Sequence, residues 1–300
     1  MNNQNEHIEA FVRFNDSLRS EYQKIDKSNI KERLKAVGEF YNANRLDKSE
    51  LAKYKMNSIA AVDGSLNSFG GAEPNVLNLI SSCYLPDLNR ERINKARIIS
   101  PLVGDEDSPS RELARLEVLT AIDGIKKYKS HACLMDGGFI RFITNAESDF
   151  KELVNLANEN GTILIGVIED MKSKVVAESL DLNCYDREVV FGVLDYKEAF
   201  ILGEQYRKNQ DVGTVYLRSA LSPQAIAIDY PVIMEDKIKE AIDIVLTLTP
   251  ESGRGIPMII DMVDKFTRIT DREIEAYIKT YIDEDLRRIY LDEARKKRWM

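Results

Sequence analysis

The 300-residue sequence contains only three cysteines, Cys83, Cys133 and Cys184. Their separations match no zinc-binding spacing, and three are too few for a disulfide framework, so the sequence excludes both kinds of cross-linked small fold. Cys133 lies within an apolar run, where a thiol behaves as a small core residue. The fold must therefore be stabilised by burial of apolar side chains.

Long hydrophobic runs are also missing. No apolar stretch approaches the ~20 residues that cross a bilayer. The first ten residues, MNNQNEHIEA, are polar and lack the apolar segment of a signal peptide. With 44% hydrophobic residues, the chain can build one large core or two domains. These features predict a globular cytoplasmic protein without a membrane partner.

Basic residues are fewer than acidic ones, and the formal net charge is -8. This balance argues against a protein coated with basic residues for nucleic acid. It does not exclude a nuclease, since a metal-binding carboxylate cluster is itself acidic. Basic residues gather in 286–300, which predicts a helical tail that is either solvated or in contact with nucleic acid or a partner. Of the two histidines, His131 precedes a strand and is interpreted as a strand-edge residue.

Two apolar runs each end in an aspartate followed by glycine. The stretch SIAAVDGS, residues 58–65, leads to Asp63, and HACLMDGG, residues 131–138, leads to Asp136. One Asp-Gly pair is typical of a hairpin turn. Two such pairs after strands that look buried on both faces are less ordinary, because an unpaired buried carboxylate is costly. Coordination of Mg²⁺ or Mn²⁺, which prefer oxygen ligands, offsets that cost.

Hydrophobic periodicity predicts an α/β protein. In the first half, the pattern predicts helices over residues 6–54, and an antiparallel meander of three strands follows. A helix, the Asp136 strand, a further helix and a further strand come next, over 108–128, 132–136, 147–159 and 162–170.

The second half has the pattern of a helical segment, two strands and a series of helices. The predicted ranges are 186–208 for the helical segment, 213–219 and 225–232 for the strands, and 236–247 for the next helix. A proline at 257 indicates another helix start. Thr270 and Glu273 have the spacing of a capping box.

Further carboxylates are placed to join the two aspartates. Glu117 borders the apolar stripe of the helix over 108–128, whereas Glu112 lies in its first turn, where the helix dipole accounts for it. We therefore prefer Glu117 as a ligand. Asp261 and Asp264 share one face of a late helix, and either could point at the site. Two metal ions about 4 Å apart, held by such carboxylates, can support phosphodiester cleavage.

The order of these segments resembles the NurA nucleases, which have an RNase H-like plan. AVDGS and LMDGGFIRF resemble the family's two aspartate strands, and GIPMIIDMVDKFTRIT resembles its C-terminal motif. The resemblance covers residues 57–282. It departs from the family at Ile256, where a tyrosine is usual, at Asp264, where a histidine is usual, and at Glu169, where a lysine is usual.

The resemblance implies a fold and a division of the chain. The fold is an RNase H-like mixed sheet with flanking helices and additional N- and C-terminal helices. The expected parts are an N-terminal helical extension over 1–54, a nuclease domain over 55–285 and a basic helical tail over 286–300. The implied metal and catalytic ligands are Asp63, Glu117, Asp136 and Asp264.

The resemblance also implies an activity and partners. NurA proteins are Mn²⁺-dependent exo- and endonucleases of single-stranded DNA and duplex ends, and Mg²⁺ is an alternative ion. They act as homodimers with a hexameric HerA-type ATPase in the processing of double-strand breaks. Lys172, Lys174 and Arg141 lie close in sequence to the predicted strand ends, so we expect at least one of them to contact DNA phosphate.

Apolar residues in the terminal helices exceed what two solvated helices need, which indicates packing on the core or a dimer interface. They are Phe11, Val12, Phe14 and Leu18 at one end, and Tyr277, Tyr281, Ile289, Tyr290 and Trp299 at the other.

Two other interpretations stay open at this point. One is a degenerate NurA-like protein that binds DNA or a partner without cleaving. The other is an ATP-using, sugar-kinase-like fold, although the sequence contains no second DGS unit.

Overall fold

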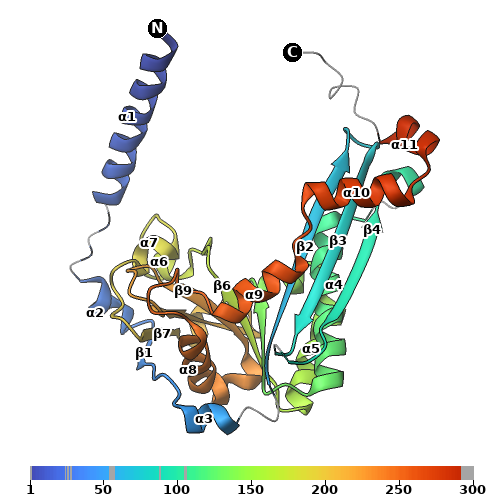
Figure 1. The fold of residues 1–300 in the computed structure, drawn as a ribbon. Helices are drawn as coiled ribbons and strands as arrows, with labels where there is room; N and C mark the ends of the chain where they lie inside the picture. The colour runs from blue at the N-terminus through green and yellow to red at the C-terminus, as the bar shows by residue number, and fades with distance from the viewer. Residues whose placement is uncertain are drawn as a thin grey trace.

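The structure is a computed structural model that describes residues 2–23, 25, 27, 29–53, 58–87, 89–104 and 107–291. A nine-stranded mixed sheet forms its centre, in the order β1-β7-β8-β9-β6-β5-β2-β3-β4 (Figure 1). Within the described part of the chain, every helix is too short or too polar to traverse a lipid bilayer. Helices cover both faces of the sheet, as predicted for an α/β fold.

One half of the sheet follows the predicted element order. Strands β2 (Ile59–Gly70), β3 (Val76–Leu85) and β4 (Ile93–Ile99) form an antiparallel meander. Helix α4 (Pro109–Tyr128), strand β5 (Ala132–Asp136), helix α5 (Phe139–Glu159) and strand β6 (Ile163–Ile168) come next, with η1 (Pro101–Val103) before α4. β5 lies parallel to both β2 and β6. This arrangement is the RNase H-like core.

Helix α5 begins earlier than the sequence indicates. It starts at Phe139 rather than near 147, and its helical backbone is interrupted at Ala146, whose φ of -147° is not helical. The predicted helix corresponds to the part after this kink. The earlier part begins three residues after Asp136 and therefore starts at the edge of the sheet where that aspartate lies.

The second half of the chain extends the sheet and adds the late helices. β8 (Val212–Leu217) and β9 (Ile226–Pro231) confirm the two predicted strands. Helices α8 (Ile238–Leu248), α9 (Met258–Thr267), α10 (Asp271–Tyr281) and α11 (Glu284–Tyr290) follow. Thr270 and Glu273 form the predicted capping box at the start of α10. Short elements complete this half: α6 (Val175–Ser179), α7 (Asp186–Val190), η2 (Glu204–Tyr206) and η3 (Val232–Lys237).

Two predicted helical segments contain strands. Helices α1 (Asn2–Gln23), α2 (Ile30–Leu34) and α3 (Lys48–Lys53) confirm part of the helical prediction for 6–54, but β1 (Gly38–Asn42) lies between them. The prediction for 186–208 is wrong at β7 (Glu198–Leu202), which pairs antiparallel with β1. β1 pairs with β7, and β7 also pairs with β8, so long-range pairing overrides local helical periodicity. The division at residue 54 stays a prediction, and β1 joins the main sheet.

Asp63 lies within β2 rather than at its end. The parallel pairing with β5 covers only Ile59 to Val62, whereas the antiparallel pairing with β3 continues from Ala61 to Gly70. Asp63 is therefore the first residue of β2 beyond its β5 partner. The expectation of a turn at Asp63-Gly64 is wrong, because β3 supplies hydrogen bonds that keep the chain extended there.

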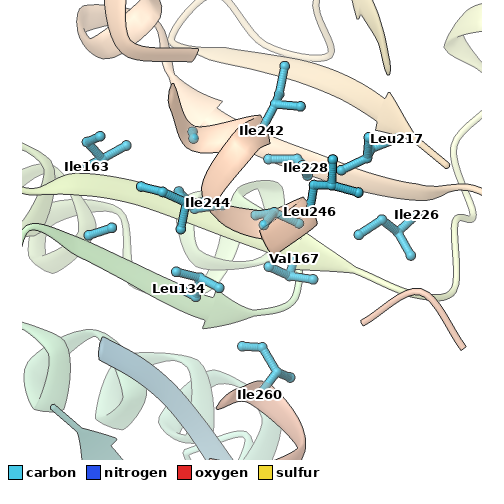
Figure 2. Packing of buried hydrophobic residues seen from close by; sticks show 14 of the residues in the cluster. Leu134, Ile163, Val167, Leu217, Ile226, Ile228, Ile242, Ile244, Leu246 and Ile260 are labelled. Carbon is cyan, nitrogen blue, oxygen red and sulfur yellow. The ribbon is translucent and has the colours of Figure 1, made fainter. Parts of the chain in front are cut away.

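Alternate residues of the strands face two separate cores. Ala61 and Leu134 pack with α8 and α9, in the layer shown in Figure 2 with Ile228, Ile242 and Ile260. Val62 and the other residues that point to the opposite face of the sheet pack with α4 and α5. The period of two along a strand thus decides which helix layer each side chain meets.

Helix α1 stands away from the sheet in Figure 1. Its apolar side chains Phe11, Val12, Phe14 and Leu18 are each more than half exposed. Tyr277, Tyr281, Ile289 and Tyr290 of the late helices are exposed as well, and Trp299 lies outside the described residues. Among the residues that the structure describes, these apolar side chains thus remain largely exposed.

Candidate active site

Asp63 is buried on the α9 side of the sheet. Its Oδ2 accepts a hydrogen bond of 3.0 Å from Thr267 Oγ1, at the end of α9. Burial raises the pKa of Asp63, the Gly64 amide and the Thr267 hydroxyl oppose that rise, and the negative charge of Asp264 adds to it. These two donors thus hold the carboxylate where α9 crosses β2.

Asp136 ends β5 on the same face of the sheet. Asp136 is two residues after Leu134 in the strand, so its side chain lies on the same face as Leu134, which packs in the α8/α9 layer. Burial raises the pKa of Asp136 to about 6, and the charges of Asp63 and Asp264 contribute to the rise. Asp63 and Asp136 are therefore close enough to repel each other, as the prediction of a shared site requires.

Glu117 approaches from the opposite face, on α4. Its carboxylate passes beside Gly64, since a Cβ built on Gly64 would lie 2.6 Å from Glu117 Oε1. The residue is almost fully buried. Burial raises the pKa of Glu117 to about 8, and the charges of Asp63 and Asp136 add to the effect. The absence of a side chain at position 64 lets Glu117 reach the level of Asp63.

Arg141 places a positive charge inside this acidic cluster. Its Nη2 forms an ion pair with Glu117 Oε2, Nη1 lies 3.4 Å from Glu117 Oε1, and Nη2 also donates to the Asp136 carbonyl at 3.1 Å. The guanidinium opposes the rise that burial causes in the pKa of Glu117 and of Asp136. The sequence places Arg141 among the candidates for DNA phosphate; the structure places its guanidinium on Glu117, and contact with DNA stays a prediction.

The two aspartates of α9 face different partners. Asp264 is exposed and close enough to Asp63 and Asp136 to affect both carboxyls. Asp261 instead pairs with Arg254, with 2.5 Å between Oδ1 and Nη2. Of the two candidates that the sequence leaves open, the structure brings Asp264 to the cluster.

The remaining candidates have partners outside the cluster or lie exposed near its edge of the sheet. Lys172 and Lys174 are exposed in the segment after β6, which leaves the sheet at the same edge as Asp136. The Lys174 ammonium lies 4.9 Å from the centroid of the Tyr185 ring. His131 lies at the other end of β5, with Nε2 2.8 Å from Glu240 Oε1. Glu112 pairs with Arg97 and Arg115 rather than with the aspartates.

The donor chemistry fits a hard divalent cation. The charge of Asp63 raises the pKa of Asp136, and the charges of both aspartates raise the pKa of Glu117. A bound cation relieves such repulsion. Among the residues that the structure describes, however, no three Asp, Glu, His or Cys side chains are arranged as a ready metal site. Both carboxylate oxygens of Glu117 face the Arg141 guanidinium in this structure.

Two residues that contact or act on the aspartates, Thr267 and Arg254, are not predicted from the sequence. Thr267 lies three residues after Asp264, so its helical spacing is the available signal. Arg254 lies between the helix predicted over 236–247 and the helix start indicated by Pro257, and its effect on Asp136 depends on the packing of α9 against the sheet. Local pattern carries no information on the second contact.

Comparisons with known proteins agree with this architecture. The family described as the NurA domain matches residues 57–269. A crystal structure of NurA superposes with a TM-score of 0.56 at 12% identity, covering 92% of this chain and 98% of that one. A structure of NurA bound to dAMP and manganese gives 0.55 at 11% identity, covering 92% and 98%. A search of curated proteins gives no match.

The family match covers more than two thirds of the chain, including β2, α4, β5 and α9, which carry the acidic cluster. The structural matches at this identity show the shared fold. The chain therefore belongs to the NurA family of nucleases.

Proposed function

We propose that this protein is a divalent-metal-dependent deoxyribonuclease that cleaves single strands and the ends of duplexes. The proposal rests on one observation: the carboxyl groups of Asp63, Glu117 and Asp136 lie close together. They come from two strands and a helix; the charge of Asp63 acts on Asp136, and both aspartates act on Glu117. Mutual repulsion of buried carboxylates has no benefit for folding alone, whereas metal-assisted cleavage needs such a cluster.

The residues of the cluster have distinct tasks in this proposal. Asp63, Asp136 and Asp264 lie on the α9 side and would hold Mn²⁺ or Mg²⁺, and Glu117 would complete the set after leaving Arg141. The Thr267 hydroxyl fixes Asp63, because it donates to Oδ2 at 3.0 Å. A bound divalent ion supplies water activation and stabilises the leaving oxygen of the phosphodiester. Lys172 and Lys174 are the proposed contacts to DNA phosphate.

The decisive experiment is a nuclease assay on end-labelled DNA with Mn²⁺, Mg²⁺ or EDTA. We expect cleavage with either metal and none with EDTA. Single-stranded, blunt and overhanging substrates, each labelled at the 5′ or the 3′ end, separate exonuclease from endonuclease products. Full activity in EDTA would contradict metal dependence.

A second function has one specific observation in its favour. The ion pair between Arg141 and Glu117 occupies a predicted ligand, as expected of a protein that binds DNA or a partner without cleaving. Thermal unfolding with and without Mn²⁺ separates the two. A protein that binds metal at the folded site is stabilised in proportion to the logarithm of the metal concentration. A non-catalytic protein shows neither this stabilisation nor cleavage.

We further propose a homodimer that pairs through α1. Its residues Ile8, Phe11, Leu18 and Tyr22 are all more than half exposed. With Asn15 they occupy successive a and d positions of a heptad, and a single asparagine at an a position favours a two-stranded coiled coil in register. The helix is short for an independent coiled coil, so we expect contacts elsewhere to contribute.

The wider setting follows from the family. We propose a hexameric HerA-type ATPase as the partner, a role in double-strand-break end processing, and a location in the cytoplasm with the DNA. Co-purification of the two proteins, with cleavage of duplex ends that depends on ATP, tests this partnership. Equal cleavage with and without the ATPase and ATP would argue against it.

A further inference from the structure

Arg254 lies beside the acidic cluster and belongs to the loop between α8 and α9. Its Nη1 is 2.8 Å from Glu169 Oε2, and its Nη2 is 2.5 Å from Asp261 Oδ1. Glu169 follows the end of β6, and Asp261 lies in the first turn of α9. Two elements that flank the cluster therefore hold one guanidinium.

The guanidinium is held and yet open to solvent. The Arg254 side chain is 59% exposed, although both of its outer nitrogens face carboxylates. Arginine has five N–H donors in a rigid fork, so two carboxylate contacts leave donors for another anion. Because the side chain is already fixed, less rotamer entropy is lost when an anion binds.

Arg254 also lies within electrostatic reach of Asp136. Burial raises the pKa of Asp136, and Arg254 is one of two arginines that oppose this rise. The other is Arg141, whose guanidinium contacts the buried Glu117 carboxylate. Arg254 is the more exposed of the two, since the Arg141 side chain is 36% exposed.

We infer that Arg254 is a phosphate-binding residue for the DNA strand at the acidic cluster, with Glu169 and Asp261 as its positioning residues. The inference rests on the proposed nuclease function. A strand that approaches the cluster meets several carboxylates, which repel phosphate. A fixed guanidinium at the rim offers charge-assisted N–H donors and sets where the backbone lies. Glu169, at the place where the family usually has a lysine, then serves to hold a cation that comes from another loop.

The first test measures DNA binding as a function of salt, with a single-stranded oligonucleotide and EDTA to prevent cleavage. Arg254→Ala should weaken binding about tenfold at fixed salt. It should also reduce the slope of log K against log salt by about 0.7, the value for one phosphate contact on a single strand. The loss should be similar for different base sequences.

Arg115→Ala is the matched control. Arg115 also lies between two carboxylates, 3.1 Å from Asp149 and 3.9 Å from Glu112, and its side chain is 46% exposed. The substitution removes the same charge from α4 without touching the rim of the cluster. A slope and an affinity of Arg254→Ala equal to those of Arg115→Ala would overturn the inference.

The second test separates positioning from binding. Glu169→Gln leaves the Arg254 charge and removes one anion that competes with phosphate. We expect a lower KM, because phosphate gains access to the guanidinium, together with a lower kcat, because the guanidinium is held less firmly. A raised KM with unchanged kcat would contradict the positioning role of Glu169.

Failure of the inference and failure of the proposed function give different results. A wild-type protein that never cleaves DNA overturns the nuclease proposal, while the salt slope of its binding still tests Arg254. A wild-type protein that cleaves, alongside an Arg254→Ala variant that cleaves and binds equally well, overturns the inference alone.

Discussion

Glu117 is the residue whose environment departs furthest from that of an ordinary carboxyl in this site. It is buried, it faces Asp63 and Asp136, and it has one close cation, Arg141. Removing one partner of a buried ion pair leaves the other charge buried without compensation, and this destabilises the fold. Single substitutions here therefore change both the chemistry and the stability, and the two effects need separate measurements.

Asp63→Asn should reduce cleavage at least about 10²-fold, because the neutral amide is a poor ligand for a hard cation. The fold should persist, since the amide oxygen can still accept the Thr267 hydrogen bond. Activity on end-labelled DNA and thermal unfolding measure the two effects. Asp149→Asn, on α5 and paired with Arg115, is the matched control and should retain activity. A fully active Asp63→Asn protein would refute the catalytic role.

The metal-free protein should lose stability as pH rises from about 5 to 8. Burial raises the folded-state pKa of Glu117 from 4.5 to about 8. The protonated form is thus favoured by folding, and this contribution is complete below the unfolded pKa and disappears as pH rises through the folded pKa. Asp136, at about 6, adds to the effect in the lower part of the window.

Glu117→Gln should flatten this dependence, since the amide does not titrate. Melting temperatures of both proteins in EDTA, from pH 5 to 8, provide the measurement. Parallel curves for the wild type and the variant would show that Glu117 does not titrate in this range.

At the scale of elements, β2 connects the two halves of the site. It pairs with β5 up to Val62, then continues with β3, so that Asp63 and Gly64 lie where one partner strand ends. Asp63 faces α9 and Gly64 faces α4, and the two adjacent residues therefore connect opposite helix layers.

Gly64→Ala should disrupt the site from within β2. The added methyl would lie 2.6 Å from both Glu117 Oε1 and Leu113 Cδ1, so α4 or the Glu117 side chain must shift. Overpacking of this kind costs about 1–3 kcal/mol. We expect a lower melting temperature and weaker cleavage, measured by calorimetry and on end-labelled DNA. Ser65→Ala, at the next position, should affect neither; equal behaviour of the two variants would contradict the close approach of Glu117.

At the scale of the whole molecule, α1 and the late helices carry exposed apolar side chains among the residues that the structure describes. Five of the apolar side chains in α1 at and beyond Phe11 are more than half exposed, and Tyr281 of α10 is 79% exposed. Exposed apolar faces of this kind mark interaction sites. A symmetric dimer would place two acidic clusters in one assembly, one for each strand of a DNA end.

Phe11→Glu should shift the protein from dimer toward monomer, because it places a charge at a d position of the proposed coiled coil. Light scattering after gel filtration at micromolar concentration should give twice 34.2 kDa for the wild type and a lower mass for the variant. Ser20→Glu, on the opposite face of α1, is the control and should leave the mass unchanged. A wild-type mass of 34.2 kDa, with or without DNA, would defeat the dimer.

The sequence by itself determined the features that depend on local periodicity and on residue chemistry. Continuous apolar runs that end in Asp-Gly pairs predicted β2 and β5 and their aspartates, and helical spacing indicated Glu117 and the Asp264 face. The order of strands and helices from β2 to β6 followed from the same pattern, because each of these elements is long or strongly apolar. The capping box at Thr270 is equally local, since its partners are three residues apart.

Only the tertiary structure decided which distant residues meet. β1 pairs with β7 across more than 150 residues of sequence, and β7 also pairs with β8; the local periodicity of the two segments does not reveal these pairings. β2 continues past Asp63 because β3 bonds to it. Two ion pairs, Arg141 with Glu117 and Arg254 with Glu169, join elements that are distant in the sequence, and a local sequence pattern does not predict them. Ion pairs and strand pairing depend on distance in space, which the packing of the helix layers on the sheet sets.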